Sequence, residues 1–128
     1  MNTATGNLLM NIKTYTEVVS IADVRGSRIA FEQQYFSENS PVRGLRDESL
    51  AALICLKKAL KQAFSDLGCN AISEEDIMIA YAENASPRLV AMPIVPLNQP
   101  RSITLSVSHS ADHAVGVAAV DYGAVNGR

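Results

Sequence analysis

The alternation of apolar and polar residues is clearest near the C-terminal end of the chain. In 103–108 every second residue is apolar, which is the period of a strand with one buried face. Residues 114–120 are small or β-branched and none is polar, which favours a strand buried on both faces. Residues 110–113 can form a tight turn, because Ser and Asp accept local backbone hydrogen bonds. The pattern predicts a hairpin that carries both histidines, His109 and His113, at the edge of a sheet.

Apolar residues at helical spacing predict two helices. The stronger pattern covers 47–67, where leucine, isoleucine and alanine form a broad apolar stripe. Acidic residues begin this segment and lysines follow, which complements the helix dipole. Gly68 is placed to end it. A shorter helix is predicted over 28–37, with Ser27 available as its N-cap.

Further strands are predicted at 15–24, 77–82 and 88–95, where β-branched residues are frequent. Short turns separate the later strands, so we expect them to pair antiparallel. The whole chain, 1–128, therefore predicts a single α+β domain in which a small, mostly antiparallel sheet packs with one long and one short helix. We expect residues 1–14 and 123–128 to be flexible.

Composition narrows the class of function. A net charge of -2 argues against nucleic acid as a partner, because domains that bind it are usually strongly basic. No segment approaches the roughly 20 apolar residues of a membrane span, and the N-terminus lacks the pattern of a signal peptide. The two cysteines lack the spacing of a metal site, which favours free thiols in a reducing compartment. We therefore expect a cytoplasmic protein that binds neither nucleic acid nor a membrane.

The segment Ser106-Val107-Ser108-His109-Ser110, with the Ala/Val-rich run after it, resembles the C-terminal motif of the 4'-phosphopantetheinyl transferases. The holo-(acyl-carrier-protein) synthase group is the most similar, since it shares the short length. Arg28-Ile29 resembles the Arg-Ile pair of that group, and Tyr35-Phe36-Ser37-Glu38 resembles its Phe-Thr-Glu-Glu segment. The resemblance extends over about 17–120. It implies the transferase fold and a homotrimer with its site at the subunit interface.

The resemblance also implies a reaction, the transfer of 4'-phosphopantetheine from coenzyme A to a serine of an acyl carrier protein. Attack on phosphorus needs cationic groups around the diphosphate, and the family uses a magnesium ion held by carboxylates. The positions that match the family's motifs imply two sets of residues. The implied catalytic residues are Lys57, Lys58 and His109, and the implied coenzyme A-binding residues are Lys57, Lys61, Ser108, His109 and Ser110.

The two carboxylates of the family's magnesium site do not fall on carboxylates here. Counted from Arg28-Ile29, the first falls on Ala22, and Asp23 is its neighbour. A shift of one residue along a strand turns a side chain to the opposite face, so Asp23 is a weak candidate ligand that needs a bulge to re-aim it. The second carboxylate falls on Lys58, whose charge repels a metal ion.

Two hypotheses for the function stay open. In the first, a divergent transferase still binds coenzyme A, with Asp23 or Glu48 in an altered site or Lys58 as a fixed positive charge. In the second, the chain keeps the transferase fold as a non-catalytic subunit that binds a carrier protein, and the lysine at 58 favours this. A hydrolase that uses Ser108 and His109 is disfavoured, because neighbours on a strand point to opposite faces. The plainer interpretation is that the lysines are a solvated helix face and the histidines exposed turn residues.

Overall fold

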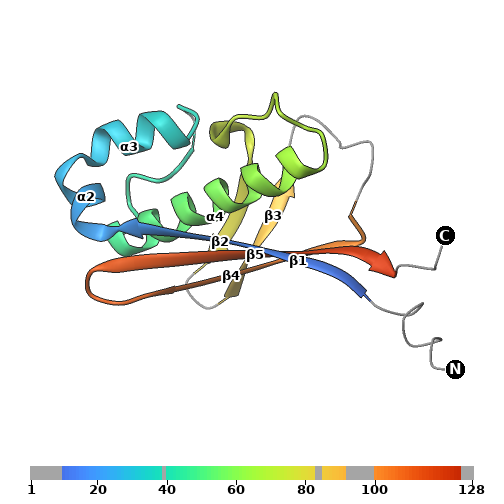
Figure 1. Ribbon diagram of the computed structural model, residues 1–128. Helices are drawn as coiled ribbons and strands as arrows, with labels where there is room; N and C mark the ends of the chain where they lie inside the picture. Colours follow the sequence, from blue (N-terminus) through green and yellow to red (C-terminus); the bar gives the residue numbers. More distant parts are fainter. Residues whose placement is uncertain (1–9, 39, 83–84, 92–99, 125–128) are drawn as a thin grey trace, which may run out of the picture.

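The computed structural model describes residues 10–38, 40–82, 85–91 and 100–124 (Figure 1). In chain order the elements are β1 (Met10–Ser20), α2 (Ile21–Gly26), α3 (Arg28–Tyr35), α4 (Asp47–Asp66), the 3₁₀ helix η1 (Glu74–Asp76), β2 (Met78–Ala82), β3 (Ala85–Ala91), β4 (Ser102–His109) and β5 (His113–Ala124). The strands form two antiparallel sheets, one in the order β1-β5-β4 and one of β2 and β3. The predicted α+β class is confirmed, with two sheets in place of one and with α2 as an additional helix.

The long helix α4 is the centre of the molecule. It packs along the three-stranded sheet, and α2 and α3 lie on the same side of that sheet (Figure 1). Every side chain in 49–57 is buried. A helix that is enclosed on most sides must be apolar around most of its circumference, as 50–56 is. None of the helices in the described ranges is long and apolar enough to cross a membrane.

The backbones of α4 and β5 approach each other closely at Gly116. A Cβ atom added to Gly116 would lie 2.7 Å from the Cβ of Cys55 and 2.9 Å from the backbone nitrogen of Leu56. The thiol of Cys55 donates to the carbonyl oxygen of Ala114, at 3.3 Å. Small residues on this face of β5 therefore fix the height and the rotation of α4 above the sheet.

The prediction that 114–120 is buried on both faces was wrong. Its side chains alternate between buried and half-buried, because the helices cover only one face of the three-stranded sheet. The opposite face carries Val115 and its register partner Val18, which is 54% exposed. Within the described ranges, no element covers this opposite face.

The predicted strand at 15–24 was wrong at its end, because β1 stops at Ser20 and a helix follows. The hydroxyl of Ser20 accepts a hydrogen bond from the backbone N–H of Asp23, at 3.2 Å, and so caps α2. Ile21 and Val24 turn into the core from α2. Residues 10–14, which we expected to be flexible, form the first part of β1.

Both predicted helices are confirmed. The long helix ends at Asp66, and Gly68 follows it with a φ of +87°. The N–H of Cys69 bonds to the carbonyl oxygen of Phe64 at 2.8 Å and closes the end of the helix. The short one corresponds to α3. Ser27 stands at its N-cap position but makes no side-chain capping bond. Cys55 and Cys69 are free thiols, as expected.

The strands after α4 also follow the prediction, with shifted ends. The predicted 77–82 corresponds to β2, and 88–95 corresponds to β3, which starts three residues earlier, at Ala85. Residues 92–95 lie outside the described ranges. The hairpin of β4 and β5 is confirmed, and its turn is closed by the N–H of Ser110 bonding to the carbonyl oxygen of His113 at 2.9 Å.

The contact at Gly116 yields a prediction for stability. We expect Gly116→Ala to lower the free energy of unfolding by about 1–3 kcal/mol, because the new methyl group forces α4 away from β5. Urea denaturation measures the change. Gly44→Ala is the matched control, since nothing lies within 4 Å of a Cβ at that position. Equal losses in the two variants would contradict this account of the packing.

Candidate functional site

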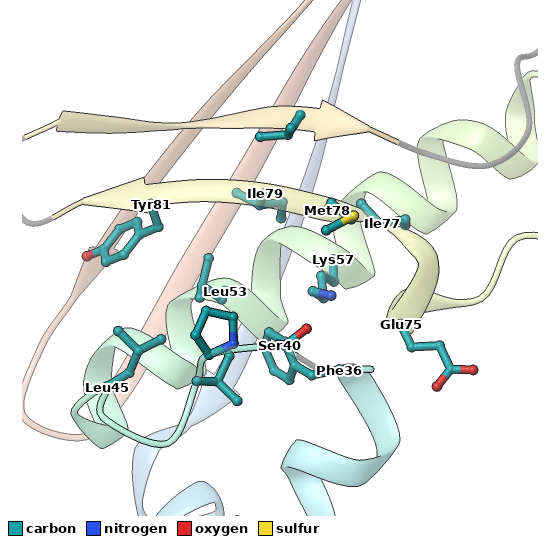
Figure 2. Close-up of a pocket in the computed structure, with 13 residues that line it drawn as sticks. Phe36, Ser40, Leu45, Leu53, Lys57, Glu75, Ile77, Met78, Ile79 and Tyr81 are labelled. Atoms are coloured by element: carbon teal, nitrogen blue, oxygen red, sulfur yellow. The ribbon is translucent and has the colours of Figure 1, made fainter. Parts of the chain in front are cut away.

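An apolar pocket lies between α4, the loop before it, and β2 with β3 (Figure 2). Its volume is about 200 Å³. Its apolar wall includes Phe36, Leu45, Leu53, Ile77, Ile79 and Val90. These residues come from five separate segments of the chain, so the pocket exists only after the whole domain has folded.

Lys57 carries the positive charge of this pocket. The side chain is only 4% exposed, and its Nζ donates to the carbonyl oxygen of Glu74 at 3.2 Å. The same Nζ lies 4.3 Å from the centre of the Phe36 ring (Figure 2), which is a cation–π contact. Burial lowers the pKa of Lys57 to about 8, and the nearby carboxylates of Asp76, Glu75 and Glu74 limit this lowering by favouring the ammonium. An ammonium that is buried in an apolar wall is therefore the chemical feature of the pocket.

Arg28 holds the loop that forms one wall of the pocket. Its guanidinium bonds to the carboxylates of Glu32 at 2.7 Å and Asp47 at 3.0 Å, and to the carbonyl oxygen of Val42 at 2.8 Å. Arg28, together with Arg25, lowers the pKa of the Asp47 carboxyl. Because these groups belong to α3, α4 and the loop between them, Arg28 fixes where Val42 lines the pocket.

Lys58 and Lys61 lie on another side of α4, over a shallow polar hollow. The Nζ of Lys58 is 3.9 Å from a carboxylate oxygen of Glu17 on β1, and Gln62 also donates to Glu17. The Nζ of Lys61 is 3.2 Å from a carboxylate oxygen of Glu74. Successive helix residues are rotated by about 100°, which is why neighbouring lysines reach different surroundings. The structure thus groups Lys58 with Lys61 and sets Lys57 apart.

The hairpin motif is exposed at the edge of the three-stranded sheet. His109 is the last residue of β4, and its Nδ1 lies 3.2 Å from the carbonyl oxygen of Ser110. The hydroxyl of Ser110 accepts hydrogen bonds from the N–H groups of Asp112 and His113, each at 3.2 Å, so it shapes the turn. Ser108 and His109 alternate along β4 and therefore point to opposite faces. No hydrogen bond or ion pair among the described residues joins this motif to the lysines of α4.

The candidate ligands for a magnesium ion do not come together. Asp23 is exposed in the first turn of α2. It does not belong to a strand, so no bulge can re-aim it as the sequence-based prediction required. The last residue of β1 is Ser20. Glu48 faces two arginines, with Arg25 at 3.7 Å. The described ranges contain no cluster of three His, Cys, Asp or Glu residues that could hold a metal ion. With Lys58 beside Glu17, the donors that the described residues offer at this position do not fit magnesium.

Sequence reasoning missed the pocket but contained one signal for it. Lys57 has Leu53 and Leu60 as its neighbours on the helix surface, at spacings of four and three residues. A lysine inside such an apolar patch is a candidate for burial. The pocket walls supplied by 77–81 and Val90 leave no comparable pattern, because they depend on how β2 and β3 fold back over α4.

Comparison with known proteins shows which solved structures share this fold. No model of a protein family matches the sequence, and no curated protein matches it significantly. Solved structures do match. The holo-[acyl-carrier-protein] synthase of Helicobacter pylori in complex with coenzyme A is 24% identical, with a TM-score of 0.65 over 84% of this chain and 99% of that one.

Two further solved structures agree with it. The holo-(acyl-carrier-protein) synthase of Bacillus anthracis in complex with CoA (3',5'-ADP) is 18% identical, with a TM-score of 0.65 over 88% of this chain and 98% of that one. The acyl carrier protein synthase of Mycobacterium tuberculosis is 22% identical, with a TM-score of 0.62 over 86% and 97%. At such identities the likeness shows the fold, so this chain has the fold of these holo-(acyl-carrier-protein) synthases.

The burial of Lys57 predicts a dependence of stability on pH. Its ordinary pKa of 10.5 falls to about 8 in the folded protein, so between these values the unfolded chain binds more protons at this site. The folded state therefore gains stability from Lys57 as the pH rises through this window. From pH 7 to pH 10.5 we expect the free energy of unfolding of the unmodified protein to rise by roughly 3 kcal/mol relative to that of Lys57→Met. Denaturant titrations at each pH measure this difference, and a constant difference would contradict the assignment.

Proposed function

We propose that this chain is a holo-(acyl-carrier-protein) synthase-like protein that binds coenzyme A and serves the transfer of 4'-phosphopantetheine to a carrier-protein serine. The supporting observation is a fold shared over almost the full length of holo-(acyl-carrier-protein) synthases that were solved with coenzyme A. Their ligand comes to this chain as a proposal that rests on the fold and on the hairpin motif around His109.

The groups proposed to bind coenzyme A are cationic or donate hydrogen bonds. Lys58 and Lys61 line a polar hollow on α4, and such ammonium groups attract the phosphates of coenzyme A. His109 and Ser110 stand exposed at the hairpin. The resemblance puts the site at a subunit interface, which agrees with a single chain in which the hairpin and the lysines make no contact with each other. The resemblance also implies Lys57 as a residue that binds coenzyme A. In this structure Lys57 lies in the separate apolar pocket, away from Lys58 and Lys61.

We propose that the described residues of this chain do not hold a magnesium ion. The strand-end position holds Ser20, and Lys58 is paired with Glu17. A fixed ammonium on Lys58 can attract a diphosphate, but it cannot bind and orient two oxygens as a metal ion does. The proposal therefore expects the affinity for coenzyme A to come from the lysines and the hairpin of this protein.

A second candidate function is a non-catalytic subunit that binds a carrier protein. The Lys58–Glu17 pair favours it, since this pair takes the place of an acidic metal site. A transfer assay separates the two candidates. Apo acyl carrier protein is incubated with the protein and coenzyme A, and its mass is followed by mass spectrometry. Gain of one phosphopantetheine group supports the first candidate, and binding of the carrier protein without transfer supports the second.

A homotrimer belongs to the same proposal. The face of the three-stranded sheet away from α4 carries small and β-branched residues, among them Val18, Val115 and Val117. Single exposed apolar residues are common, but valines that lie side by side on β1 and β5 favour contact with another protein surface. Their register partners on β4 are the polar residues Ser106 and Ser108. Another copy of this chain is the proposed partner.

Substitution on that face tests the trimer. We expect the unmodified protein to sediment as three chains and Val18→Glu to sediment as one, because a buried and unpaired carboxylate opposes association. Val18 is 54% exposed within one chain, so the substitution spares the core. Ile29→Glu on α3, at a residue 72% exposed, is the matched control that keeps the trimer. A monomeric unmodified protein refutes the trimer.

The two histidines of the hairpin allow a matched test of coenzyme A binding. We expect His109→Ala to weaken binding about tenfold and His113→Ala to change it less than twofold, because only His109 belongs to the motif. Both residues are exposed, so both variants should fold. Isothermal calorimetry with coenzyme A measures the two affinities. Equal effects of the two changes would remove His109 from the proposed site.

A further inference from the structure

The apolar pocket of α4 has a mouth that is itself apolar. Met78 and Val90 both line it, and they are 55% and 57% exposed. Exposed apolar residues that border a cavity favour a ligand with an apolar body, because the ligand removes both the wall and the rim from water. The pocket differs in this respect from the polar hollow beneath Lys58 and Lys61.

The pocket also contains a buried positive charge that has no carboxylate partner among the described residues. Lys57 uses one of its three donors, toward the carbonyl oxygen of Glu74. The nearby carboxylates face other groups: Glu74 pairs with Lys61, Asp76 accepts from the hydroxyl of Ser73, and the Glu75 carboxylate points away from Lys57 (Figure 2). None of the carboxylates in the described ranges lies within ion-pair distance of Lys57. A buried ammonium in this state favours a ligand that brings a negative charge.

The size of the cavity limits the ligand. A methylene group takes up about as much space as a water molecule, about 30 Å³, so a cavity of about 200 Å³ holds roughly six or seven such groups. This is below the usual range of about 300–1,000 Å³ for drug-sized ligands. A short unbranched chain fits this volume.

We propose that this pocket binds a medium-chain carboxylate, with the alkyl chain between α4 and β2 and the carboxylate on the Lys57 ammonium. This inference goes beyond the proposed binding of coenzyme A and does not depend on it. One ammonium suits a single carboxylate group, whereas a phosphate would leave more acceptors unpaired. The neutral alcohol of the same chain length lacks the charge and is the natural comparison.

Calorimetry with sodium octanoate and with 1-octanol tests the inference on the full-length protein. We expect octanoate to bind at least tenfold more tightly than octanol to the unmodified protein. The side chain of Met is unbranched like that of Lys, one atom shorter and uncharged. In Lys57→Met we therefore expect octanoate to bind about tenfold more weakly and octanol to bind with unchanged affinity. Lys13→Met is the matched control, because it removes one exposed lysine that is paired with Asp66 on another part of the surface.

The pH dependence provides a second readout. Octanoate should bind more weakly as the pH rises from 7 to 9.5, because Lys57 loses its proton near pH 8. In this range octanoate binding should take up protons, so the measured heat should vary with the ionisation enthalpy of the buffer. The charged and titratable groups around Lys57 are Glu74, Glu75 and Asp76 on η1, Lys61 on α4 and Tyr81 on β2. A titration with octanol over the same pH range is the control for effects that do not involve the charge of the ligand.

The outcomes separate clearly. Stronger binding of octanoate than octanol that depends on Lys57 supports the inference, whatever coenzyme A does. No binding of octanoate at millimolar concentration overturns it, and so does equal binding to the unmodified protein and Lys57→Met. If Lys57→Met fails to fold, Val90→Glu takes its place. That change puts a negative charge at an exposed rim position and should weaken octanoate more than octanol. Equal weakening of both ligands overturns the inference.

Discussion

The close packing of α4 on β5 is the constraint on which the rest of the structure depends. Gly116 leaves room for the backbone of α4 at Cys55 and Leu56, and this fixes the rotation of the helix. Once the rotation is fixed, the direction of every α4 side chain follows from the helical repeat. Lys57 must then enter the apolar pocket, while Lys58 must face β1.

The two neighbouring lysines show how environment decides chemistry. Lys57 is buried beside Phe36, and the cost of burying its charge lowers its pKa to about 8. Lys58 is half-buried and faces Glu17, so its charge has a partner. The fold is shared with holo-(acyl-carrier-protein) synthases. At the position where the resemblance implies a carboxylate ligand, this chain has a lysine that is paired with Glu17. An ammonium cannot coordinate a metal ion, although it can attract a phosphate.

The sequence predicted the helices and strands better than it predicted which of their faces are buried and where a pocket forms. The helix at 47–67 could be predicted because its periodicity spans five turns and Gly68 ends it. The end of β1 could not, because Ser20 caps a helix of only six residues, too short to show a period. The one-sided burial of β5 was missed, since an apolar run does not show how many layers cover it. The hairpin motif was recognised, but the pocket was not, because its walls meet only in the folded domain.

Calorimetric titration with coenzyme A, in parallel with magnesium and with a chelator, tests the central claim most directly. The claim is the proposal that this chain binds coenzyme A without magnesium, with the Lys58–Glu17 pair at the position where the resemblance implies a metal ligand. The account predicts binding with the same dissociation constant under both conditions. Absence of binding, or binding that requires magnesium, would contradict it.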